Sequence, residues 1–274
     1  MTMTATRRVA LVTGASAGIG KAIVRRLLAD GWTVYGAARR VDQMADIQGQ
    51  GTKVLALDVT DDASMQAAIK AILDAEGKID ALVNNAGYGS YGAIEDVPIA
   101  EARRQFEVNV FGVARLCQLV LPSMRTATSG AIVNITSMGG RIWMPVGGWY
   151  HATKHALEVL SDTLRVEVRP FGVRVVIVQP GAIESEWSAI AARTLRESSK
   201  NSVYGAFVAP MARVLESYGS AASPDVVAEA VSAAVNSSSP RRRYATPFQS
   251  KLYIFAHWLL PDWAWERMVA ASVK

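Results

Sequence analysis

The stretch that most restricts how this chain can fold is Thr13-Gly14-Ala15-Ser16-Ala17-Gly18-Ile19-Gly20. It follows a short apolar run over 9–12, typical of a buried strand, and precedes a helical pattern over 21–29. Glycines let a backbone approach a bound pyrophosphate, and the free N–H groups at a helix N-terminus attract anions. The order strand, glycine loop, helix therefore predicts a phosphate-binding turn, with an ordinary tight turn as the alternative.

Strands and helices alternate along the rest of the chain. The expected strands are 9–12, 33–37, 53–57, 80–83, 131–135 and 173–178, and the longer helices between them are 64–75, 101–124 and 149–168. Such alternation is typical of a parallel sheet with right-handed crossovers and helices on both faces. No linker or repeat divides the 274 residues. We therefore predict one doubly wound α/β domain of the Rossmann type over 1–274, with a parallel sheet.

Two arginines follow the second predicted strand. Arg39 and Arg40 come before the first acidic residue of this region, Asp42. In dinucleotide folds an acid near this strand end binds the ribose 2′-hydroxyl, whereas an arginine accommodates a 2′-phosphate. This favours NADP(H) over NAD(H) as cofactor, with NAD(H) as the second choice and plain surface arginines as the alternative.

Two asparagine positions mark polar sites on apolar elements. Asn84-Asn85-Ala86-Gly87 ends the fourth predicted strand, where open parallel sheets bind ligands, although Asn and Gly are also turn residues. Asn109 lies among apolar residues of a predicted helix. An amide there is costly unless it finds partners. We expect Asn109 to be either a satisfied core amide or part of a polar site.

Tyr150 and Lys154 are four residues apart in the predicted helix over 149–168. Residues at this spacing share one helix face. An ammonium beside a phenol favours the phenolate, so Tyr150 could donate and accept a proton near neutral pH. By itself the pair also occurs by chance on solvated helices.

Composition and charge narrow the class of protein. The chain has 50% hydrophobic and 19% charged residues, a formal net charge of +5 and a pI of about 9.4. Its arginines stand in small separated groups without an aromatic platform, so we do not expect nucleic-acid binding. The single cysteine, Cys117, lies on an apolar helix face and reads as a core residue. The polar start of the chain has no signal-peptide pattern, and we expect a cytoplasmic protein.

Together these residues make the chain resemble the classical short-chain dehydrogenases/reductases (SDR). The matching residues, in family order, are Thr13 to Gly20, Asp58, Asn84 to Gly87, Asn109, Ser137, Tyr150-x-x-x-Lys154 and Pro180-Gly181. The run Asn-Asn-Ala-Gly-Tyr-Gly and the long C-terminal extension resemble the hydroxysteroid and retinol dehydrogenase-like members in particular.

The resemblance implies an NADP(H)-preferring oxidoreductase that transfers a hydride between the nicotinamide and a carbonyl or secondary alcohol. In it Tyr150 is the acid/base, Ser137 holds the substrate oxygen, Lys154 binds the nicotinamide ribose and tunes Tyr150, and Asn109 anchors a proton relay. No metal ion belongs to this expectation. The implied cofactor residues are Gly14, Ser16, Ala17, Gly18, Ile19, Gly20, Arg39, Asp58, Val59, Asn85, Ala86, Gly87, Tyr150, Lys154, Pro180, Gly181, Ile183 and Ser185. At Ser185 members of the family often carry threonine instead.

The loops expected around this site are more apolar than polar. They carry Tyr88, Tyr91, Met138, Ile142, Trp143, Met144, Trp149 and Trp187. We therefore expect a lipophilic carbonyl or alcohol substrate, with Tyr88, Met138, Trp143 and Trp187 as contacts. The alternative is that several of these side chains pack the core or a subunit contact. The segment 184–219 is expected to be helical and to cover the pocket as a lid.

The C-terminal extension, 247–274, contains the apolar run Leu252–Leu260, which is too short to span a bilayer. It could cap the pocket, join a subunit interface or lie on a membrane surface, and the first two are favoured. The family resemblance also implies that 241–246 is the last strand of a seven-stranded parallel sheet. It further implies a homodimer or homotetramer formed through 101–124 and 149–168.

Two rival functions stay open. One is a 3-oxoacyl thioester reductase, which would need a basic surface near the pocket entrance for an acyl carrier. The other is a nucleotide-binding regulatory protein that no longer turns over.

Overall fold

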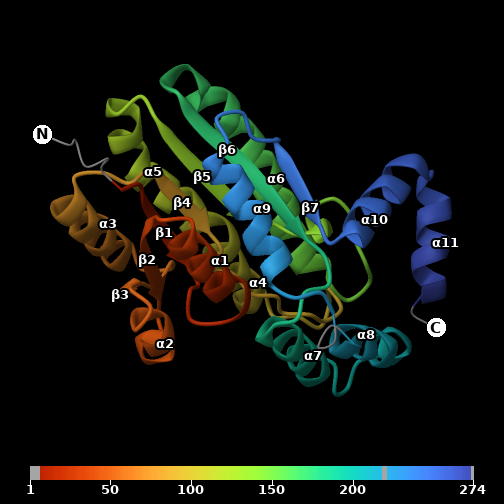
Figure 1. Ribbon diagram of the computed structural model, residues 1–274. Helices are drawn as coiled ribbons and strands as arrows, with labels where there is room; N and C mark the ends of the chain where they lie inside the picture. Colours follow the sequence, from red (N-terminus) through yellow and green to blue (C-terminus); the bar gives the residue numbers. More distant parts are fainter. Residues whose placement is uncertain (1–6, 218–220, 273–274) are drawn as a thin grey trace, which may run out of the picture.

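One parallel sheet of seven strands, ordered β3-β2-β1-β4-β5-β6-β7, organises the molecule (Figure 1). The computed structural model describes residues 7–217 and 221–272. The strands are β1 Val9–Thr13, β2 Thr33–Ala38, β3 Lys53–Ala56, β4 Ala81–Asn84, β5 Gly130–Ile135, β6 Val173–Pro180 and β7 Arg243–Thr246. The predicted doubly wound Rossmann-type fold is confirmed, and each strand end lies within about three residues of its predicted position.

Helices cover both faces of the sheet (Figure 1). They are α1 Gly18–Ala29, α2 Ala45–Gln48, α3 Asp62–Glu76, α4 Ile99–Phe106, α5 Gly112–Thr126, α6 Gly148–Val168, α7 Glu186–Ser198, α8 Gly205–Ser217, α9 Asp225–Asn236, α10 Phe248–Leu259 and α11 Asp262–Ser272. On one face α1 and α9 pack together, and on the other face α3, α5 and α6 do so. This is the two-sided cover that buried parallel strands require.

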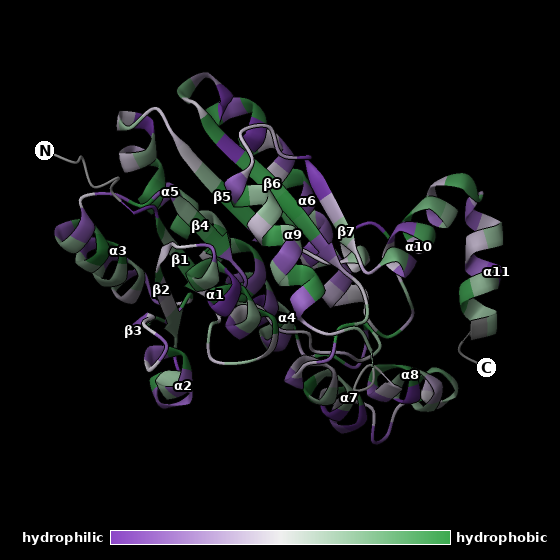
Figure 2. Cartoon of the chain, in the orientation of Figure 1, coloured by the Kyte–Doolittle hydropathy of each residue, from purple (hydrophilic) through white to green (hydrophobic). Residues whose placement is uncertain are grey.

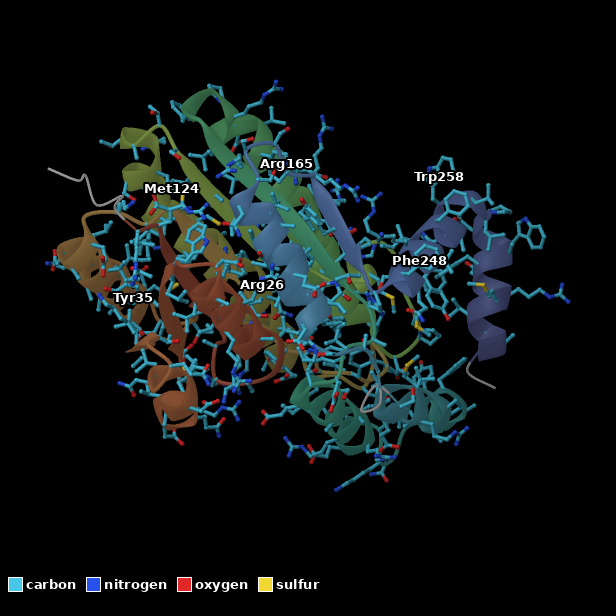
Figure 3. All side chains as sticks on the ribbon, in the orientation of Figure 1. Arg26, Tyr35, Met124, Arg165, Phe248 and Trp258 are labelled. Atoms are coloured by element: carbon cyan, nitrogen blue, oxygen red, sulfur yellow. The ribbon has the colours of Figure 1, made fainter. Side chains whose placement is uncertain are left out.

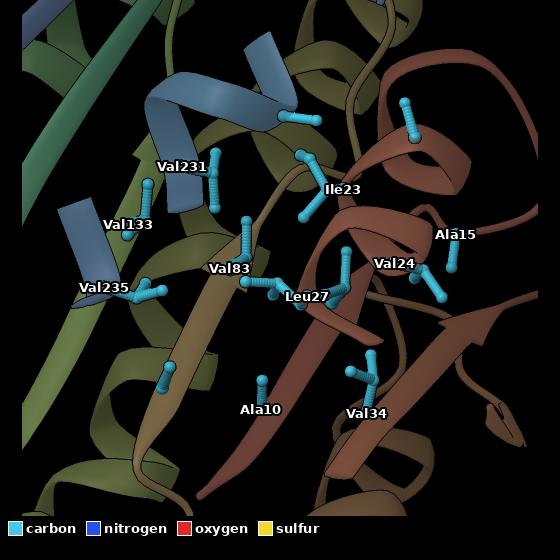
Figure 4. Close-up of a cluster of buried hydrophobic side chains, with 14 of the residues drawn as sticks. Ala10, Ala15, Ile23, Val24, Leu27, Val34, Val83, Val133, Val231 and Val235 are labelled. Atoms are coloured by element: carbon cyan, nitrogen blue, oxygen red, sulfur yellow. The ribbon is translucent and has the colours of Figure 1, made fainter. Parts of the chain in front are cut away.

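Alternate residues of the strands build the two cores. In β1, Ala10 and Val12 face α1 and α9, whereas Val9 and Leu11 face α3, α5 and α6. Figure 4 shows the first of these cores, in which Ile23 and Leu27 of α1 approach Val231 and Val235 of α9 over the strands. All five residues of β1 are buried. The carboxyl end of this strand, which leads into the glycine loop, is therefore held firmly from both sides.

Two helices differ from their predicted bounds for local reasons. Helix α1 begins at Gly18, inside the glycine loop, so the loop runs into the helix without a separate capping residue. The predicted helix 101–124 is divided by a π-helical turn, Glu107–Phe111, that lies between α4 and α5 and contains the buried Asn109. Such turns often occur at functional sites.

The segment 184–219 forms the two helices α7 and α8 beside the carboxyl ends of the strands (Figure 1). Its last residues lie outside the described ones. The two helices pack against each other through Ala191, Leu195, Met211 and Leu215, and this small core also includes Tyr150. The helical character expected for this segment is therefore present over α7 and α8.

The C-terminal helices α10 and α11 stand out from the body of the molecule (Figures 1 and 2). Trp265 is 2% exposed and packs with Ile142, whereas Trp258 is 75% exposed and points away from the fold (Figure 3). Phe248, also labelled in Figure 3, is exposed as well. In the described part of the chain, no helix is both long and apolar enough to cross a membrane.

Candidate active site

A cleft of about 860 Å³ runs along the carboxyl ends of the strands and under α7. It crosses the point where the strand order reverses, between β1 and β4. Open α/β sheets bind ligands at this switch point. The cleft begins at the glycine loop and Asp58, passes Gly87 and Ser137, and ends against Trp187.

The glycine loop at one end of the cleft has no room for a Cβ at Gly14 or Gly20. Gly14 and Gly18 have φ values of +66° and +48°, which other residues rarely adopt. A Cβ on Gly20 would lie 2.1 Å from the Gly14 carbonyl oxygen. The loop is thus folded on itself, and its N–H groups lie at the start of α1, where an anion is favoured.

The Asn-Asn-Ala-Gly stretch is tied to the glycine loop. The Asn85 amide donates to the carbonyl oxygens of Thr13 and Gly14 at 3.0 and 3.3 Å. The backbone N–H groups of Asn85 and Ala86 both donate to the Thr13 hydroxyl, each at 3.0 Å. These bonds fix the residues after β4 against the glycine loop. The two segments that line this part of the cleft are therefore held in a fixed position relative to each other.

Arg40, rather than Arg39, reaches the glycine loop. Its guanidinium lies 3.5 Å from the Ser16 hydroxyl and donates to Glu186 at the start of α7 at 3.2 Å. Arg39 also lines the cleft. Its charge acts on Asp58, whose carboxylate accepts from the Thr60 N–H and hydroxyl at 3.0 and 2.8 Å. Both arginines therefore border the region where a nucleotide ribose would lie.

The polar corner at the other end of the cleft is formed by β5 and α6. Tyr150 and Lys154 are only 6% and 7% exposed, and the Lys154 Nζ lies 6.0 Å from the centre of the Tyr150 ring. The Ser137 hydroxyl accepts from the Gly139 N–H at 3.0 Å. All three side chains line the cleft.

Burial sets the protonation of the groups in this corner. It lowers the pKa of Lys154 to about 8, and the nearby Glu158 carboxylate opposes this shift. Lys154 also donates to the Ile135 carbonyl oxygen at 3.0 Å. Burial lowers the pKa of His151 to about 4, so this imidazole is neutral near pH 7 and cannot supply a proton as an acid. The phenol of Tyr150 and the ammonium of Lys154 are therefore the two candidate proton donors of this corner.

Asn109 lies behind this corner, buried, and does not line the cleft. Its side-chain amide donates to the Tyr88 carbonyl oxygen at 2.8 Å and to the Thr153 hydroxyl at 3.1 Å. Its Oδ1 accepts from the Tyr88 N–H at 3.1 Å. The amide is thus satisfied, and it joins the loop after β4 to helix α6 next to Lys154.

Aromatic side chains close the far end of the cleft. The Trp187 ring centre lies 5.1 Å from that of Tyr150 and 5.9 Å from that of Tyr91. A Cβ on Gly89 would lie 2.5 Å from the Trp187 ring, so glycine is required there. Tyr88 lines the cleft too, but its hydroxyl donates to Glu101 at 2.9 Å.

Most residues predicted from the sequence meet in this cleft. Of the predicted cofactor, catalytic and substrate residues, all line it except Asn109 and Trp143. Trp143 is 38% exposed and lies outside the cleft, because its neighbour Ile142 takes the inward position. No residue of 247–272 lines the cleft, so the structure gives no support to the expected capping role of the C-terminal extension.

Several residues of the site were not predicted. They are His151, Thr153 and Glu158 near the polar corner, and Ile190 and Arg193 on α7. Arg40 was expected only together with Arg39, without a contact of its own to the glycine loop. The doubled arginine and the acidic residue one turn after Lys154 were signals in the sequence. The α7 residues follow only from how that helix lies over the cleft.

Comparison with known proteins places the chain in one family of oxidoreductases. Residues 8–195 match the short chain dehydrogenase family. The 3-ketodihydrosphingosine reductase of Bacteroides thetaiotaomicron is 40% identical over 64% of this chain and 63% of its own. The NADPH-dependent 3-dehydrocapnine reductase of Ornithobacterium rhinotracheale is 33% identical over 97% of this chain and 98% of its own. A short-chain dehydrogenase structure from Streptomyces avermitilis has a TM-score of 0.82 and 35% identity, covering 92% of this chain and 93% of that one.

The fold and the cleft thus define a nicotinamide-dependent oxidoreductase. The chain belongs to the short-chain dehydrogenase/reductase family, whose members bind NAD(P)(H). The narrower likeness to hydroxysteroid and retinol dehydrogenases stays a prediction.

Proposed function

We propose that the protein is an NADPH-preferring reductase of a ketone carried on a long apolar chain. The observation that carries this proposal is the burial of Tyr150 and Lys154 together at the inner corner of the cleft, beside Ser137 and under Trp187. A phenol and an ammonium are buried there at the end of the cleft that begins at the glycine loop, which suits proton transfer coupled to hydride transfer.

The residues present fit a dinucleotide. The glycines of the loop leave a cradle that any Cβ would fill, and the start of α1 favours a pyrophosphate. Gly87 is less restricted than the loop glycines, since a Cβ there would lie 3.1 Å from the Asn109 Oδ1 and 3.6 Å from the Lys154 Nζ. In this proposal Asp58 and Val59 hold the adenine, Lys154 the nicotinamide ribose, and Pro180, Gly181, Ile183 and Ser185 the nicotinamide side. Bound NADPH would supply the hydride.

The chain's own residues would handle the substrate oxygen. Tyr150 donates its proton to this oxygen as negative charge develops there, and Ser137 donates a hydrogen bond to the same atom. The Lys154 ammonium stabilises the phenolate that remains. Asn109 keeps the corner in place by joining the loop after β4 to Thr153 of α6.

The cofactor preference gives a test of both arginines. We expect Arg39→Asp and Arg40→Asp each to raise the ratio of the NADPH to the NADH dissociation constant by about 10- to 100-fold, because each removes one charged contact to a 2′-phosphate. Fluorescence titration with both nucleotides measures the ratio. Arg103→Asp, which changes an arginine outside the cleft by the same charge, is the control. If the ratio stays unchanged in both cleft variants, the 2′-phosphate assignment is wrong.

The apolar end of the cleft supports a lipophilic substrate. Ile142, Met144, Trp187 and Ile190 line it beyond Tyr150. The two named relatives are a 3-ketodihydrosphingosine reductase and a 3-dehydrocapnine reductase, names that denote reduction of a keto or dehydro group. We infer the same direction of reaction here.

A series of methyl ketones with increasing alkyl length tests this pocket. We expect kcat/KM with NADPH to rise by about two- to fourfold for each methylene until the pocket is filled, since a buried methylene contributes about 0.8 kcal/mol. In Trp187→Ala we expect kcat/KM to increase less with alkyl length. Trp143→Ala changes a residue outside the cleft and should show the same increase as the wild-type protein. A flat series in the wild-type protein would contradict the lipophilic pocket. Turnover restricted to 3-oxoacyl thioesters would favour the rival reductase.

A further inference from the structure

A carboxylate is buried directly behind the proposed catalytic corner. Glu158 follows Lys154 by four residues on α6, so the two lie on the same face of the helix. Its side chain is only 4% exposed. Burying a carboxylate is costly unless it is paired and hydrogen-bonded. The groups that pair with Glu158 therefore indicate its role.

The partners of Glu158 come from two strands that carry the site. Its Oε1 accepts from the Thr136 hydroxyl at 2.7 Å and from the Gln179 amide at 3.0 Å. Thr136 follows the last residue of β5 and immediately precedes Ser137. Gln179 lies at the end of β6 and immediately precedes Pro180. One carboxylate oxygen therefore links the carboxyl ends of β5 and β6. These ends lead directly into Ser137 and Pro180, which are proposed to contact the substrate oxygen and the nicotinamide.

The other oxygen of Glu158 is paired with β7. The Arg243 Nε donates to Oε2 at 3.0 Å. Arg243 also pairs with Asp162, one turn further along α6, and Asp162 pairs in turn with Arg165. β5 and β6 contribute only neutral groups to the carboxylate, and Gly140 packs against its stem. The charged groups around Glu158 are thus Lys154 on one side and Arg243 with Asp162 on the other.

We propose that Glu158 is a positioning residue of the reaction, which clamps the ends of β5 and β6 and keeps the Lys154 amine protonated. The inference rests on the proposed function and extends it to a residue that lies outside the cleft. Burial alone favours the neutral amine of Lys154. The Glu158 carboxylate, one helical turn away, favours the charged form of Lys154. The hydrogen bonds from Thr136 and Gln179 hold this carboxylate in place.

The test titrates the Lys154 amine with and without this charge. Trace acetic anhydride modifies only unprotonated amines, and mass spectrometry of the Lys154 peptide across a pH series gives the midpoint, with the exposed Lys70 as internal reference. In Glu158→Gln we expect the midpoint to fall by about one pH unit, as the loss of a nearby opposite charge requires. The alkaline limit of NADPH-dependent kcat/KM should move to lower pH by a similar amount.

Two matched variants separate charge from geometry. Glu158→Asp keeps the charge but shortens its reach, so we expect the wild-type midpoint with kcat/KM lowered about tenfold at pH 7. Asp162→Asn removes the same charge one turn further on, at a side chain 42% exposed, and should leave the midpoint within a few tenths of a unit. Because unfolded molecules expose Lys154 to the reagent, the midpoints are compared among variants whose far-UV circular dichroism matches that of the wild-type protein.

The outcomes are distinct. A midpoint in Glu158→Gln equal to that of the wild-type protein overturns the electrostatic role, and full activity in Glu158→Asp overturns the clamp. Because labelling needs no turnover, a wild-type protein that consumes no NADPH would contradict the proposed function while the shift of the Lys154 midpoint is still measured.

Discussion

Replacing Tyr150 with phenylalanine should reduce turnover by about 10²- to 10⁴-fold, the range expected when a general acid is removed. The substitution deletes one hydroxyl at the buried corner and keeps the ring that packs against Trp187 and Tyr91. The cleft should therefore keep its shape, and the NADPH dissociation constant should change by less than about threefold.

Steady-state assays with NADPH and a long-chain ketone measure this loss, and fluorescence titration measures the binding. Tyr253→Phe is the matched control, because Tyr253 is exposed on α10 and far along the chain from the cleft residues. Retained turnover in Tyr150→Phe would assign the acid to another group. If the wild-type protein binds NADPH but shows no turnover, the result would favour the alternative of a nucleotide-binding regulatory protein.

Replacing Gly20 with alanine should damage both cofactor binding and stability. A Cβ at this position would lie 2.1 Å from the Gly14 carbonyl oxygen and 2.6 Å from the Asn85 amide nitrogen. Both contacts are with groups that fix the loop to β4, so the loop must open. We expect a loss of about 3 kcal/mol in the free energy of unfolding and loss of measurable NADPH binding.

Gly205→Ala provides the control for this substitution. Gly205 begins α8, and a Cβ there would meet nothing within 4 Å. Alanine favours a helix over glycine by about 1 kcal/mol, so this variant should be unchanged or slightly more stable. Urea unfolding compares the two variants. A Gly20→Ala protein that unfolds and binds NADPH as the wild type does would contradict the proposed role of the loop.

The sequence contained most of the fold because its signals were local. Buried strands and the helices between them follow from apolar runs and periodicity, and the glycine loop follows from its place between a strand and a helix. The π-helical turn Glu107–Phe111 was not predicted, because a single turn is too short to change the apolar periodicity of a long helix noticeably. Only the need for amide partners pointed to that position.

The site was predictable wherever a residue follows a strand end, because those ends meet at one edge of the sheet. Glu158 was missed because its role depends on β6 and β7, which come later in the chain and lie beside α6 only after folding. Trp143 was placed in the pocket wrongly, since neighbouring residues of a loop face opposite ways and composition cannot say which. The positions of α10 and α11 depend on the packing of Trp265 against Ile142. These residues are far apart in the sequence, and no pattern near either of them indicates the contact.

The most direct test of the central claim follows the hydride itself. Purified protein is given NADPH deuterated at both C4 positions together with a long-chain ketone, and the product is analysed by mass spectrometry. The account predicts an alcohol with one deuterium on the former carbonyl carbon, formed by the wild-type protein and at least about 10²-fold more slowly by Tyr150→Phe. An alcohol without deuterium, or no alcohol from any ketone although NADPH binds, would contradict it.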